Sequence, residues 1–260
     1  MSAVLRRVRS LSAAEMRLLF RNKTAVFSAF VLPLGMVGLL AGVKIDGGQL
    51  STNAFVMTSL LGFVLLAAVY YNLVTTYVSR REELVLKRLR AGELTDREIL
   101  AGVAAPAIVV AVLQCLVAAV AGAAWLGLPV PVNLVLLLVA VLGGTVVFVL
   151  LAAASAAFTR TAEMAQVTTL PVLMACLLGS GVVLPLTELP EPVADVLRVL
   201  PLTPVVDLMR LGWSGTVGVE APAGFTGVLA PSLAPLGLLA VWLVLGTLAV
   251  KRWFRWEPRR

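Results

Sequence analysis

The stretch VNLVLLLVAVLGGTVVFVLLAAASAAF, residues 132–158, decides the fold class of this chain. It contains no Asp, Glu, Lys or Arg. A helix rises about 1.5 Å per residue, so about 20 apolar residues cross a hydrocarbon core about 30 Å thick. This run is therefore long enough to span a membrane, even as a tilted helix.

Five other runs are similarly long and free of charged side chains: residues 24–43, 54–78, 99–124, 164–184 and 232–250. Of the 260 residues, 60% are hydrophobic and only 13% are charged, far from the composition of a soluble domain. The first run carries Pro33 and is not followed by a small-residue cleavage site, so it is interpreted as a permanent span. Cys115 and Cys176 fall inside spans, where they imply no disulfide framework. The sequence predicts an all-α polytopic membrane protein, with one transmembrane domain over residues 1–260.

The distribution of basic residues predicts the orientation of these spans. Of the 21 Lys and Arg residues, 18 lie before the first span, between spans two and three, between spans four and five, or after the last span. Lys and Arg are retained in the cytoplasm, so both termini and the loop at 80–98 are predicted to be cytoplasmic. The net charge of +7 is thus a topology signal. The basic residues sit at span ends instead of on one folded surface, which argues against nucleic-acid binding.

Residues 12–23 predict a basic amphipathic helix in the membrane interface before the first span. Ser12 and Glu15 have the spacing of a capping box, and Met16 falls on a different face from Arg17 and Arg21. The alternative is a plain basic flank that only orients the span.

The segment RREELVLKRLRAGELTDREIL, residues 80–100, predicts two helices separated at Ala91 and Gly92. In the first helix, Glu83 and Lys87 are spaced for an ion pair. The second begins with a capping box formed by Thr95 and Glu98. Between the charges lies a short apolar ridge, Val85, Leu86 and Leu89. We expect this ridge to dock a soluble partner, because the sequence offers it no core of its own; a solvated charged face is the alternative.

Residues 185–215 predict an outer hairpin, re-entrant or interfacial, which must pack on protein or line a cavity. Pro192 and Pro204 are each placed to begin a short helix, roughly 192–199 and 204–211. Both helices are too short to cross a bilayer.

The absences restrict the possible functions. The chain has no His, and none of the six runs contains an ionisable Asp, Glu, Lys or Arg, so the usual groups for proton coupling, metal binding and catalysis are missing. No G-x-x-x-x-G-K-[ST] phosphate loop occurs. Polar residues Asn72, Thr75, Thr76 and Ser79 share one stripe of the second span. That stripe lines a substrate path or forms hydrogen bonds between helices.

Three strings carry a family resemblance: LLFRNKTAVFSAFVLPLGM at 18–36, RREELVLKRLRAGELTDREILAG at 80–102, and LTELPEPVADVLRVLPLTPVVDLMR at 186–210. In these strings and in its layout, the chain resembles the permease subunit of type-2 ABC exporters, as found among bacterial drug-export permeases. The resemblance implies a location in the bacterial cytoplasmic membrane. It also implies pairing with a second permease, as a homodimer or with a related chain, surrounded by membrane lipids. One departure is the turn AGELTD, where many relatives have proline.

The resemblance also implies a separate ABC ATPase subunit, which binds ATP and Mg, while this chain holds no cofactor and no metal and has no catalytic residues of its own. The ATPase-coupling role would fall on Glu82, Glu83, Val85, Leu86, Arg88 and Leu89. The translocation path would be lined by Asn72, Thr75, Thr76, Thr168, Thr169 and Met174. The alternatives are an ATPase-independent secondary exporter and a membrane scaffold protein. The missing intramembrane carboxylate argues against secondary export.

Overall fold

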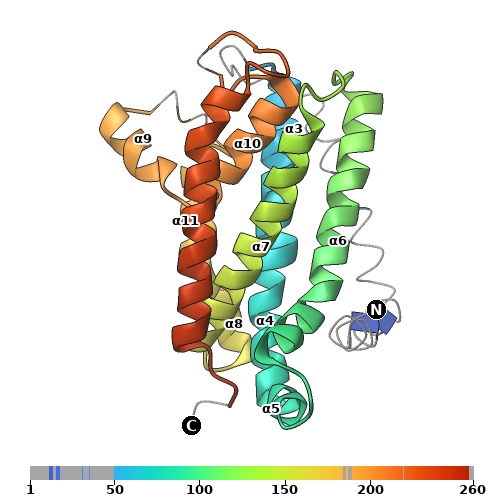
Figure 1. Cartoon of the computed structure of the whole chain (residues 1–260), viewed down its shortest axis with the longest axis vertical. Coiled ribbons are helices and arrows are strands. Elements are labelled where there is room, and N and C mark those ends of the chain that lie inside the picture. The colour runs from blue at the N-terminus through green and yellow to red at the C-terminus, as the bar shows by residue number, and fades with distance from the viewer. Residues whose placement is uncertain are drawn as a thin grey trace.

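A computed structural model shows the chain as a bundle of helices (Figure 1). It describes residues 50–183, 186, 189–218 and 220–257, together with six isolated helical positions before residue 50. The expected interfacial helix at 12–23 and first span at 24–43 lie outside the described residues, apart from those positions. Among the described residues from 51 to 257, every regular element is a helix.

Five long apolar helices have the length and composition to cross a membrane. The first runs without interruption through α3 (Thr52–Val64), η1 (Leu65–Tyr71) and α4 (Asn72–Glu82). The others are α6 (Asp96–Trp125), α7 (Leu134–Phe158), α8 (Ala162–Gly179) and α11 (Leu229–Trp253). Each overlaps one of the charge-free runs in the sequence. The prediction of an all-α polytopic membrane protein is confirmed.

The helix from α3 to α4 forms the centre of the bundle. Its middle turns, η1, are π-helical, and there Leu65, Leu66, Val69 and Tyr70 are fully buried. The Tyr70 hydroxyl lies 3.1 Å from Oγ of Ser155 on α7, which gives its polar end a partner inside the bundle. Because α7 also packs against α4, α10 and α11, α7 connects the central helix to the rest of the bundle.

Side-chain caps fix where the spans begin. Thr95 and Glu98 form the predicted capping box at the start of α6: the Thr95 amide donates to Oε2 of Glu98 at 2.7 Å, and the Glu98 amide donates to Oγ1 of Thr95 at 3.4 Å. Asn133 caps α7 by accepting from the Leu136 amide at 3.0 Å. Polar residues at the beginnings of the apolar runs therefore satisfy the free amides of the first helical turns.

The outer segment contains two short helices, α9 (Glu191–Arg198) and α10 (Thr203–Ser214), close to the two short helices expected there. α9 extends to the side of the bundle, whereas α10 lies among α3, α7 and α11 (Figure 1). Ten of the twelve α10 residues are buried. Gly212 permits the close approach of α10 to α7, because a Cβ added there would lie 2.8 Å from the backbone nitrogen of Leu137. The backbone of α10 is thus covered by protein, as a non-spanning segment at membrane depth requires.

Candidate functional site

The candidate site is the end of the bundle where α4 leads into α5 (Val85–Arg90) and on to α6 (Figure 1). The chain turns sharply at Leu84, which has a φ of 59° in the left-handed region and is 40% exposed. Backbone bonds close this turn: the Glu83 amide donates to Ser79 O at 3.0 Å, and the Leu84 amide donates to Arg81 O at 3.1 Å. A short helix therefore leaves the spanning helix at a fixed bend.

This bend makes the predicted Glu83–Lys87 ion pair wrong. The pair required one continuous helix, but the break at Leu84 leaves Glu83 in the turn after α4 and places Lys87 on α5. Instead, Glu83 pairs with Arg80 at 3.3 Å, and Lys87 pairs with Glu257 near the C-terminal end of the chain at 2.9 Å.

The apolar ridge faces inward, which corrects the expectation that it has no core of its own. Leu86 is fully buried, and the partly buried Leu89 packs against the hydrophobic core. Val85 is also only partly exposed. At this end of the bundle, the Tyr77 hydroxyl donates to Leu100 O at 3.0 Å. The Tyr77 ring packs edge-on against the Phe254 ring, with the two ring centres 6.1 Å apart. The ridge fixes α5 to the bundle, and Leu86 cannot contact a partner directly.

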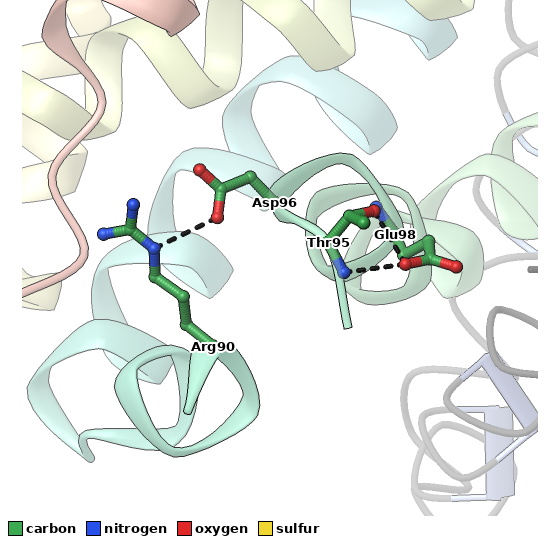
Figure 2. Close-up of polar contacts among 4 residues, drawn as sticks. All are labelled: Arg90, Thr95, Asp96 and Glu98. Atoms are coloured by element: carbon green, nitrogen blue, oxygen red, sulfur yellow. Dashed lines mark hydrogen bonds and ion pairs between the residues drawn. The ribbon is translucent and has the colours of Figure 1, made fainter. Parts of the chain in front are cut away.

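The opposite side of α5 is charged and exposed. The exposed side chains here are Glu82 at the end of α4, Glu83 and Leu84 in the turn, and Lys87, Arg88 and Arg90 on α5. Arg90 pairs with Asp96 at 3.1 Å, beside the Thr95–Glu98 capping box (Figure 2), and its guanidinium lies 5.0 Å from the centre of the Trp256 ring. Arg88 makes no ion pair within the described part of the chain. These six side chains are called the α5 surface below.

Two adjacent residues at the end of α4 bind other spanning helices. Arg81 is buried, and its guanidinium donates from Nη1 to Ala156 O at 2.8 Å and from Nη2 to Thr159 O, at the C-terminal end of α7. Glu82 accepts a hydrogen bond from the Ala162 amide at 3.1 Å, at the first residue of α8. Each charge matches the helix end that it contacts, positive at a C-terminus and negative at an N-terminus.

The role of Arg81 was not apparent from the sequence. It stands next to Arg80 just beyond an apolar run, where a basic residue is expected merely to orient a span. No local spacing distinguishes a buried cap of a distant helix from such an anchor, because α7 ends more than 70 positions later in the chain.

The expected path residues of α4 lie on its open side. Asn72 is exposed and Thr75 and Thr76 are partly exposed, whereas Leu73 and Val74 on the other side of the helix are buried. The Thr76 hydroxyl donates to Asn72 O of its own helix at 2.9 Å. Within the described part of the chain, Asn72, Thr75 and Thr76 form no hydrogen bond to a neighbouring helix.

The expected path residues of α8 do not share one surface. Met174 is 40% exposed. Thr168 is partly buried, with its hydroxyl 2.8 Å from that of Thr159, and Thr169 is fully buried, donating to Ala165 O at 2.7 Å. Thr169 thus faces the interior of the chain, while Met174 faces outward.

Two ionisable residues lie within the bundle on α10, although the long apolar runs contain none. Arg210 is buried, donates from Nη2 to Gly181 O, and stacks over the Phe55 ring at 4.8 Å. Asp207, one turn earlier, is partly buried. The sequence argument against secondary transport relied on a missing carboxylate, and it overlooked Asp207 because α10 is too short to be read as a span.

The sequence was also compared with known protein families and curated proteins. Residues 6–212 match the family model described as ABC-2 type transporter. None of the curated proteins matches the chain significantly.

Proposed function

Because the chain belongs to the ABC-2 type transporter family and is a membrane-spanning component of an ABC transporter, we propose that it is the permease subunit of an ATP-driven exporter. In this proposal two copies form the translocation path in the bacterial cytoplasmic membrane. A separate ATPase subunit binds ATP and Mg and supplies the energy. The α5 surface faces the cytoplasm and docks that ATPase.

The observation that carries the proposal is the attachment of α5. Its inner side is fixed by Leu86, while its outer side presents charges to solvent. At its base, α4 is bonded to the end of α7 through Arg81 and to the start of α8 through Glu82. A force applied to the α5 surface would therefore act on three spanning helices at once, as a coupling element requires.

The proposal assigns different tasks to the expected coupling residues. Arg88 and Glu83 contact the ATPase, because both are exposed. Glu82, Leu86 and Leu89 transmit its movement, because they bind or pack inside the chain.

The open side of α4 is the proposed lining of the path. Asn72, Thr75 and Thr76 lie there on the helix that is otherwise the most deeply buried of the spans. A polar strip costs free energy when it faces lipid, so it favours a surface that faces a water-accessible path or the second copy. Met174 extends this lining onto α8, and Thr169 is left out of it.

The docking claim is tested by charge reversal on the α5 surface. Arg88→Glu should lower the amount of ATPase that co-purifies with the tagged chain from its native host about tenfold, because a reversed charge at an interface is repelled. Lys251→Glu, an exposed reversal at the C-terminal end of α11, is the matched control and should keep full association. Equal association in both variants would refute docking through α5. A charge at Leu86 is unsuitable for this test because it would disrupt the core.

A secondary exporter is the second candidate, favoured by the partly buried Asp207. Export that persists without ATPase activity, collapses with the proton gradient and is lost in Asp207→Asn would establish it. Export that stops when the ATPase is inactivated would support the ABC mechanism.

A further inference from the structure

A groove with a volume of about 580 Å³ runs between α7 and α11 and takes no part in the proposed coupling or translocation surfaces. Its floor is built from small residues, Ala154 of α7 and Gly246 and Ala249 of α11. The helices touch at Gly246, where an added Cβ would lie 2.9 Å from Cβ of Leu150. Because these side chains are small, the groove stays open on the outside of the bundle.

The groove is apolar along its length and basic at one end. Trp242 lines it near the middle of α11, and Arg252 and Trp253 line it where α11 ends. Ten residues of helix separate Trp242 from Arg252, a distance of about 15 Å. That length is about half of a hydrocarbon core about 30 Å thick. The groove therefore extends over one leaflet, from the headgroup level towards the midplane.

Arg252 is available to an external ligand. Its side chain is exposed and makes no ion pair with any described residue. Lys251 beside it is also exposed. Trp253 is half exposed and rests edge-on against Phe158 at 5.7 Å, which is a typical placement for an aromatic side chain at the membrane interface.

We propose that this groove binds one anionic phospholipid of the leaflet at this end of the bundle. The acyl chain lies over Ala154, Gly246 and Ala249, and the phosphate accepts hydrogen bonds from the Arg252 guanidinium. A guanidinium presents paired donors that match phosphate oxygens, and basic pockets between spanning helices suit anionic headgroups. In the proposed orientation this is the cytoplasmic leaflet. The site requires only that the chain spans a membrane, so it can fail or hold independently of transport.

A second copy of the chain is a less suitable occupant. A two-fold contact uses the same patch on both subunits, so it would set Lys251 and Arg252 of one copy close to their counterparts. Like charges in that position repel. An anionic lipid neutralises the same charges.

The two tryptophans that line the groove provide a direct readout. The full-length chain is placed in phosphatidylcholine nanodiscs with increasing amounts of phosphatidylglycerol that carries brominated acyl chains, which quench tryptophan on contact. The reciprocal series uses brominated phosphatidylcholine. The groove signal is the difference between the unaltered chain and the W242F/W253F variant, which subtracts the other three of its five tryptophans.

We expect half-maximal quenching at an about fivefold lower fraction of phosphatidylglycerol than of phosphatidylcholine, the preference expected from one basic side chain near an anionic headgroup. Arg252→Gln should abolish this preference. Arg255→Gln, an exposed neighbour that does not line the groove, should retain it. Ala249→Leu, which fills the groove, should weaken quenching by both lipids.

Four results would overturn the proposal. Equal quenching by the two lipids would remove the headgroup preference, and an equal effect of Arg255→Gln would attribute it to diffuse surface charge. Unchanged quenching in Ala249→Leu would place the acyl chain outside the groove. An intermolecular disulfide through Leu248→Cys, in a chain with Cys115 and Cys176 replaced by Ala, would show that a second copy occupies it.

Discussion

Arg81→Met removes the guanidinium that joins α4 to the end of α7 and keeps a side chain of similar length. The guanidinium donates to Ala156 O at 2.8 Å and also to Thr159 O. A hydrogen bond from a charged donor contributes about 1.5–3 kcal/mol, so the two together contribute about 3–6 kcal/mol. Water at this end of the bundle can hydrate the released carbonyls, so we expect a loss near the lower bound, about 3 kcal/mol.

The assay is thermal unfolding of the purified chain in detergent, followed by the loss of the folded peak in size-exclusion chromatography. For a chain of this size, about 3 kcal/mol corresponds to a fall in Tm of roughly 6–12 °C. Arg80→Met is the matched control, because Arg80 is partly exposed and its ion pair with Glu83 is worth about 1 kcal/mol or less. Arg81→Lys should lie between the two, since an ammonium cannot form the same fork. A Tm for Arg81→Met within about 2 °C of the unaltered chain, or an equal loss in Arg80→Met, would refute the capping role.

Three further variants test the packing and the energy source. Gly212→Ala should lower the free energy of unfolding by about 1–3 kcal/mol, because the new Cβ lies 2.8 Å from the backbone of α7. Gly237→Ala is the control and should not lower it, because an added Cβ there meets open space. Equal Tm values for the two variants would contradict the close contact. Leu86→Ala should cost about 2–5 kcal/mol of unfolding free energy and Leu84→Ala little, as measured by denaturant titration; the reverse order would mean that the ridge faces outward. Asp207→Asn should leave ATP-driven export of a fluorescent substrate within about twofold of the unaltered chain, and complete loss would favour proton coupling instead.

The segment from α4 to α6 shows which structural features short-range sequence patterns can predict and which they cannot. The capping box of Thr95 and Glu98 was predictable, because both partners lie within one turn and the bonds that they form depend on that spacing. The burial of Leu86 was not predictable, because an apolar residue between charged ones gives the same sequence pattern whether it faces a partner or its own chain. The bend at Leu84 decided between these, and a leucine in the left-handed region carries no sequence signal.

The α10 helix shows a second limit. A start near Pro204 and a short length were readable from the sequence, and both indicated a segment outside the spans. Its position among α3, α7 and α11 was not readable, because it depends on contacts such as that of Gly212 with α7. As a result, the sequence placed Arg210 and Asp207 in an outer hairpin, whereas the structure places them within the bundle.

By itself, the sequence determined that this chain is an all-helical membrane protein, because the length of an apolar run and the thickness of a bilayer are compared directly, without any knowledge of folding. It also located the ends of helices, where caps act over three or four residues. Only the tertiary structure decided which side of each helix is open: it buried Leu86 and Arg81, exposed Arg88, and left the groove beside Arg252. These outcomes depend on pairs of residues far apart in the chain, whose meeting is set by the packing of whole helices.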